Sequence, residues 1–246
     1  MKIFSIFFAI LLNYTATAQK IIGAVMVDEN GITQNEKKAK YLVVLKNYGD
    51  TAFERLDYSF AGPMQTSTTF KDSQLSILNG RYMEYNSSGY LHSEGNYDHN
   101  RKDGKWYIYD DTSHAVLEYK FHLDTLISTI DLDSLHKEKE KIKEDTTGQF
   151  EAVYVGGVKK IAEIIQKNIQ IPDRMAALTN GGTSRVRFVV DIEGKLQNIE
   201  IQKSVEFSFD EESLRVVALL KDWMPASDKG EKVKAYRVQP ITVTLQ

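Results

Sequence analysis

The chain has 246 residues, no cysteine, 42% hydrophobic and 26% charged residues, and a formal net charge of −3. This composition argues against wholesale disorder, a collagen-like chain and a membrane protein with several spans. The mild acidity argues against a nucleic-acid partner, which would need a basic face. The lack of cysteine excludes disulfides, thiolate nucleophiles and Cys-ligated zinc.

The first eighteen residues have the features of an export signal. Lys2 gives a positive start, an apolar run follows over 3–12, and Ala16-Thr17-Ala18 offers a cleavage site before Gln19. The run is about ten residues long, whereas a membrane-spanning helix needs about twenty. We therefore expect a cleaved signal peptide over 1–18 and a location in the periplasm. The alternative is an uncleaved leader that anchors the chain in the inner membrane, facing the periplasm.

Residues 19–130 are expected to form an antiparallel β-meander, because short aromatic and apolar segments alternate there with turn residues. The segments that start at Gly80 and Gly104, GRYMEY and GKWYIY, repeat with a period of 24 residues. They resemble the MORN-like repeats of bacterial exported proteins, which build such hairpins. The aromatic residues either pack between the strands or form an exposed face that contacts another envelope component. The candidates for that meander surface are Tyr82, Tyr85, Tyr97, Trp106 and Tyr109.

Residues 131–149 are interpreted as a solvated linker or short exposed helix that separates two domains. The stretch 131–148 holds ten charged residues and few large apolar ones, and it contains no proline. A rigid proline-rich spacer is therefore not expected here.

The segment 150–246 predicts the order helix, strand, strand, helix, strand. The first helix has apolar residues at helical spacing and should end before Pro172. Two strands follow over 186–192 and 196–201, joined by a turn at Gly194.

The second helix is expected to use Asp210 as its N-cap, with Phe209 packing onto Leu214 as a hydrophobic staple. Trp223 and Pro225 are expected to end this element.

The last strand is expected over 234–245, interrupted by Pro240, so that Tyr236 and Val238 are out of phase with the residues after it. Proline cannot donate to a β-ladder and is confined to edges or bulges. The sequence therefore predicts that this is an edge strand.

Together these segments resemble the C-terminal domain of the TonB family over residues 150–246. Two departures are Val155, where the family usually has proline, and Ala226, where glycine is common. The resemblance implies an α+β domain with an antiparallel sheet. The motifs that carry it are Tyr154-Val155-Gly156-Gly157, Ile169-Gln170-Ile171-Pro172, Val186-Arg187-Phe188-Val189-Val190, Gly194, Phe209-Asp210, Leu214-Arg215-Val216-Val217, Trp223-Met224-Pro225, Gly230 and Pro240-Ile241-Thr242-Val243.

The resemblance also implies a partner, a segment of an outer-membrane TonB-dependent receptor that adds as a strand beside the last strand. An exposed edge strand is the kind of surface that such β-augmentation uses. The alternatives are that the meander, or a second copy in a homodimer, covers this edge. The expected partner-binding residues are Tyr236, Arg237, Val238, Gln239, Ile241, Thr242, Val243, Thr244 and Leu245.

An energy transducer would also need an inner-membrane helix that docks on a proton-driven motor complex, and an extended spacer. The sequence shows neither clearly. We therefore expect a TonB-like periplasmic protein that is either the energy transducer or an accessory to it. The alternative function is a periplasmic scaffold that acts through the Tyr-rich meander.

The sequence carries no motif for catalysis, for a metal or for a cofactor. None of the five histidines lies in an H-E-x-x-H pattern, and no G-x-S-x-G elbow or phosphate-binding loop occurs. We expect no enzymatic activity, no cofactor and no metal site.

Overall fold

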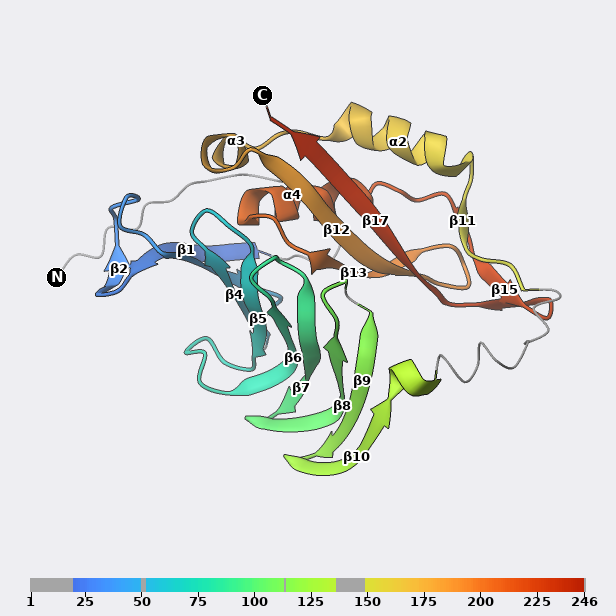
Figure 1. The fold of residues 1–246 in the computed structure, drawn as a ribbon, viewed down its shortest axis with the longest axis horizontal. Helices are drawn as coiled ribbons and strands as arrows, with labels where there is room; N and C mark the ends of the chain where they lie inside the picture. Colours follow the sequence, from blue (N-terminus) through green and yellow to red (C-terminus); the bar gives the residue numbers. More distant parts are fainter. Residues whose placement is uncertain (1–19, 50–51, 113, 136–148, 246) are drawn as a thin grey trace.

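The computed structural model describes residues 20–49, 52–112, 114–135 and 149–245 (Figure 1). The expected signal peptide and most of the charged connector, residues 136–148, lie outside the described residues. Within the described part, the protein is α+β, as predicted. An antiparallel meander sheet is followed by a smaller unit of helices and short antiparallel strands (Figure 1).

The N-terminal part is a single sheet of ten antiparallel strands in the order β10-β9-β8-β7-β6-β5-β4-β3-β1-β2. From β3 to β10 every strand pairs with its neighbour in sequence, because short turns join consecutive strands. The strands are β1 Lys20–Asp28, β2 Gly31–Thr33, β3 Tyr41–Asn47, β4 Phe53–Ser59, β5 Met64–Phe70, β6 Leu78–Tyr85, β7 Leu91–Asp98, β8 Arg101–Tyr109, β9 Ala115–His122 and β10 Thr125–Asp131.

The C-terminal part is built on a three-stranded antiparallel sheet in the order β13-β12-β17. One face of this sheet packs against α4, whose buried residues include Phe209 and Val216. The elements are β11 Val153–Tyr154, α2 Gly157–Asn168, α3 Asp173–Leu178, β12 Gly181–Val190, β13 Leu196–Lys203, α4 Phe207–Val217, β14 Trp223–Met224, β15 Ala226–Asp228, β16 Glu231–Val233 and β17 Ala235–Thr244.

The start of the second helix was predicted wrongly. Helix α4 begins at Phe207, and its N-cap is Glu206, whose carboxylate accepts from the Phe209 backbone N–H at 2.7 Å. Asp210 cannot act as the cap because its carboxylate turns into the core and accepts from the Val205 N–H at 3.1 Å. The helix ends at Val217, before the predicted end at Trp223 and Pro225. The short elements α3 and β14–β16 were not predicted.

The meander and the C-terminal part share one hydrophobic core. Tyr58 of β4 lies edge-on to Phe207 of α4, with ring centroids 5.5 Å apart. Tyr85 of β6 donates its hydroxyl to the Ile201 carbonyl of β13 at 2.8 Å. The backbone N–H of Ser204 donates to the Gly89 carbonyl at 2.9 Å. The two parts are therefore packed together rather than joined only by the connector.

Gly95 of β7 lies under the indole ring of Trp106 on the neighbouring strand. A Cβ at this position would lie 2.1 Å from Trp106 Cδ2, closer than any real contact. We expect Gly95→Ala to lower the free energy of unfolding by about 1–3 kcal/mol, because the buried indole must move. Urea denaturation checks this. Gly23→Ala is the control, since a Cβ at Gly23 meets no atom within 4 Å; equal effects of the two substitutions would contradict the expectation.

Candidate binding site at the edge of the C-terminal sheet

Strand β17 lies at the edge of the C-terminal sheet, as predicted. It pairs with β12 over ten residues, from Ala235↔Val190 to Thr244↔Gly181, without a shift of register. Its other side pairs with no strand within the described part of the chain. The described strands of the meander form a separate sheet, and none of them pairs with this edge.

Pro240 does not interrupt the strand, which corrects the prediction. The ladder continues through the pair Pro240↔Arg185. Because proline has no N–H and alternate residues of an antiparallel strand point their backbone groups to the same side, the even positions must point away from β12. Just beyond the strand, the N–H of Leu245, an odd position, donates to the Asn180 carbonyl at 3.3 Å. This agrees with odd positions pointing toward β12.

Four of the nine predicted partner-binding residues therefore direct their backbone groups outward, away from β12. The outward N–H donors come from Tyr236, Val238, Thr242 and Thr244. The predicted odd positions, Arg237, Gln239, Ile241, Val243 and Leu245, direct their backbone groups toward β12 instead.

Side chains follow the same alternation, and the predicted phase of Tyr236 and Val238 is confirmed. Tyr236 is 77% exposed, whereas Ile241 is buried in the core. Arg237 is held on the inner side, where its Nε donates to the Ala152 carbonyl at 2.9 Å and its Nη2 to Glu151 at 2.8 Å. The free edge thus presents backbone groups together with the side chains of the even positions.

The meander aromatics pack mainly against one another and against the C-terminal part. Trp106 stacks on Tyr82 at 5.8 Å and meets Tyr97 edge-on at 5.2 Å. Trp106 is 4% exposed and Tyr85 6%, so these two do not belong to an exposed aromatic face. Tyr109 donates to the Glu94 carboxylate on β7, and its ring centroid lies 6.0 Å from the guanidinium of Arg187 on β12. These contacts favour the packing interpretation of the repeat.

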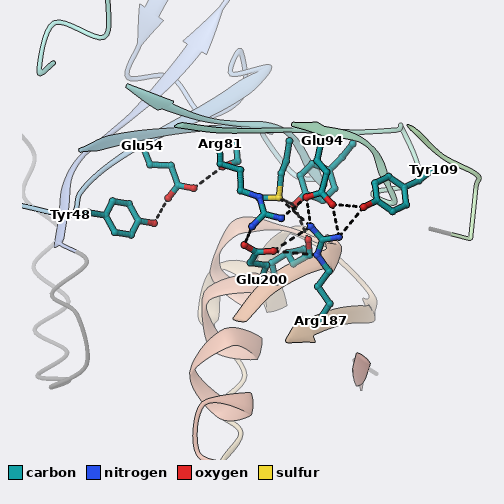
Figure 2. Close-up of polar contacts among 11 residues, drawn as sticks. Tyr48, Glu54, Arg81, Glu94, Tyr109, Arg187 and Glu200 are labelled. Carbon is teal, nitrogen blue, oxygen red and sulfur yellow. Dashed lines mark hydrogen bonds and ion pairs between the residues drawn. The ribbon is translucent and has the colours of Figure 1, made fainter. Parts of the chain in front are cut away.

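A network of charged side chains joins the meander to the face of the C-terminal sheet that α4 leaves open (Figure 2). Arg187 of β12 donates from Nη1 and Nη2 to the two carboxylate oxygens of Glu94 on β7, at 3.0 and 2.5 Å. Its Nε donates to Glu200 of β13 at 3.3 Å. Arg81 of β6 donates to both carboxylates, and Tyr109 of β8 donates to Glu94. No local pattern in the sequence indicates this network, because its partners are far apart along the chain.

A second buried network surrounds the Asp210 carboxylate. It accepts from the Ser204 hydroxyl at 2.5 Å, the Tyr58 hydroxyl at 3.3 Å and the Ser184 hydroxyl at 3.4 Å. Burial raises the pKa of Asp210 to about 8, and the charge of Glu206 adds to the rise, although the hydrogen bonds from Ser204 and Val205 oppose it.

We expect Asp210→Asn to flatten the dependence of stability on pH. The folded-state pKa of Asp210, about 8, lies above its ordinary value of 3.8. Its contribution to stability is thus complete below about pH 4 and is lost as the pH rises to about 8. Asparagine retains a neutral amide of the same shape. Urea denaturation between pH 4 and 8 measures the slope; the same slope in both proteins would contradict this assignment.

The described residues contain no group of three or more histidine, aspartate or glutamate side chains that could hold a metal ion. In the same part of the chain, no helix has the length and apolar character needed to cross a membrane.

Comparison with protein families identifies the C-terminal part. Residues 167–244, from the end of α2 to the end of β17, match the family described as the Gram-negative bacterial TonB protein C-terminal. The chain therefore contains a TonB C-terminal domain, which confirms the resemblance seen in the sequence. This domain supports a TonB-like role in envelope transport and an envelope-associated, periplasmic location. Searches of curated proteins and of solved structures gave no match.

Proposed function

We propose that this protein binds a short segment of an outer-membrane TonB-dependent receptor, which adds as an extra strand beside β17. The observation that carries the proposal is the outward row of backbone groups, paired with no strand among the described residues, on a regular ten-residue edge strand. This edge belongs to a TonB C-terminal domain. Strand addition uses main-chain hydrogen bonds for affinity and alternate side chains for specificity.

The energetics suit a transient complex. About six backbone hydrogen bonds at roughly 0.5–1.5 kcal/mol each give a gross gain of about 3–9 kcal/mol before the segment is ordered. Ordering the segment reduces this gain, so we expect a dissociation constant in the micromolar range or weaker. Pro240 leaves one gap in the row of donors, so the segment meets two donors on either side of it.

In-cell photo-crosslinking tests this proposal. A photoreactive amino acid replaces Tyr236 in the full chain, expressed in a Gram-negative host, and the crosslinked proteins are identified by mass spectrometry. We expect the protein crosslinked to position 236 to be an outer-membrane receptor, attached through its periplasmic segment. The matched control carries the same group at His122 of β9, an exposed position on the meander. Absence of receptor crosslinks from position 236, or equal crosslinks from both positions, would overturn the proposal.

Within this proposal the protein acts either as the energy transducer or as an accessory to it. The two roles differ in whether residues 1–18 anchor the chain beside the proton-driven motor. Cell fractionation and the intact mass of the product separate them. A periplasmic product that begins at Gln19 supports the accessory role, and an uncleaved product in the inner membrane supports the transducer.

A further inference from the structure

A cleft of about 430 Å³ lies between the meander and the C-terminal sheet, next to the β17 edge. Tyr107 and Tyr109 of β8 and Ala115 of β9 line it on the meander side, and Tyr236 and Val238 of β17 line it on the sheet side. The same two β17 residues carry outward N–H groups. The cleft is therefore continuous with the edge at which we propose strand addition.

The register of the sheet places this cleft on a defined face. Val238 is the direct cross-strand partner of Arg187, and Tyr236 is that of Val189. Arg187 points to the meander and binds Glu94 (Figure 2). Since directly paired residues share a face of a sheet, Val238 lies on the face that the meander covers. Side chains of an added strand that stand opposite Tyr236 and Val238 on this face would point toward the cleft.

Each charged side chain that lines the cleft already has an oppositely charged partner. Arg81 and Arg187 bind Glu94 and Glu200, and Arg237 binds Glu151. A charged side chain entering the cleft would lose water without gaining a free counter-ion. Apart from the amides of Asn198 and Gln202, the remaining lining residues are aromatic or aliphatic, so the cleft suits a large apolar or aromatic side chain.

We infer, building on the proposed strand addition, that the meander forms one wall of the receptor-binding site. The cleft between β8–β9 and β17 takes one large apolar or aromatic side chain of the receptor segment. The meander thereby determines which segments bind, while the β17 backbone supplies the hydrogen bonds common to all of them.

A random decapeptide display library, selected against the full chain, tests this inference. We expect the selected peptides to share a large apolar or aromatic residue at one position. Ala115→Trp fills the cleft from the meander side and should remove this preference. It should lower the affinity for peptides selected against the wild-type protein about tenfold. Tyr236→Ser removes an exposed side chain without threatening the fold and should weaken the same preference. His122→Trp is the control, because it adds tryptophan to an exposed position of β9 outside the cleft. It should change neither the residue preference nor the affinity of the selected peptides.

Thr242→Pro separates the two proposals. This substitution removes an outward N–H from a residue outside the cleft and should weaken binding of every selected peptide about 5- to 150-fold. If Thr242→Pro weakens binding in this way while the preference survives both Ala115→Trp and Tyr236→Ser in folded protein, the cleft is not the site of recognition and only this inference fails. If Thr242→Pro leaves binding intact, the β17 edge is not used and the proposed function fails as well.

Discussion

Arg187→Met is expected to lower the free energy of unfolding at pH 7 by about 3–5 kcal/mol, because it removes one partner from buried ion pairs and leaves Glu94 and Glu200 with Arg81 as their only arginine. The Arg187 side chain is 13% exposed and that of Glu94 is 12% exposed. Methionine fills a similar volume but supplies no donor to Glu94 or Glu200. Because these contacts join β12 to β7, the substitution should also loosen the meander from the C-terminal sheet. Urea denaturation, followed by the fluorescence of Trp106 and Trp223, measures both effects.

The ion pair between Arg187 and Glu94 also predicts that the protein loses stability in acid. Burial by itself would raise the pKa of Glu94, but the charge and hydrogen bonds of Arg187 outweigh it and lower the pKa to about 2, from an ordinary 4.5. The stabilisation is thus present above about pH 4.5 and is lost as the pH falls toward 2. Arg187→Met should remove this acid-sensitive contribution.

Arg55→Met is the matched control for Arg187→Met. Arg55 pairs with Asp57 on its own strand, and its side chain is 44% exposed, so water replaces the partner when the pair is lost. We expect a change of about 1 kcal/mol or less. Equal effects at the two positions would show that the network does not hold the meander to the sheet.

Thr242→Pro should reduce binding of the receptor segment about 5- to 150-fold while leaving the chain folded. It removes one outward donor, so the opposing carbonyl of the segment is desolvated without a partner, at a cost of about 1–3 kcal/mol. The β12–β17 ladder should survive, because Pro240 already occupies an equivalent position in it. Titration of the segment into purified protein gives the affinity, and a thermal melt gives the stability.

Two neighbouring variants sharpen this prediction. Thr242→Ser keeps the N–H and should bind like the wild type. Val243→Pro removes an inward N–H from the ladder and should destabilise the domain itself. Equal affinities of Thr242→Pro and Thr242→Ser would show that the outward backbone row does not bind the segment.

The features predictable from sequence were those that local chemistry determines. Turn glycines and short alternating segments predicted the meander, and Pro240 predicted the edge strand because a missing N–H is a property of one residue. The cap of α4 was missed because aspartate is a preferred N-cap residue and glutamate is not. The Asp210 carboxylate instead accepts from the buried hydroxyls of Ser204 and Tyr58, which lie far apart in the sequence.

The packing of the meander on the face of the C-terminal sheet that α4 leaves open could not be predicted from the sequence. Polar residues that alternate along a strand, as Arg185 and Arg187 do, predict a solvated face. Arg187 instead forms an ion pair with Glu94, which lies 93 residues earlier in the chain. The cleft depends on the same long-range packing of the meander, so neither the ion network nor the cleft has a local signature.

Amide hydrogen exchange, resolved by residue and recorded with and without the receptor segment identified by crosslinking, tests the central claim most directly. We predict that the segment slows exchange at Tyr236, Val238, Thr242 and Thr244, the outward donors of β17. The amides of Arg237, Gln239, Ile241 and Val243 should change little, since they point toward β12. Slower exchange at another strand edge, such as β10, with the four outward amides unchanged, would contradict the account.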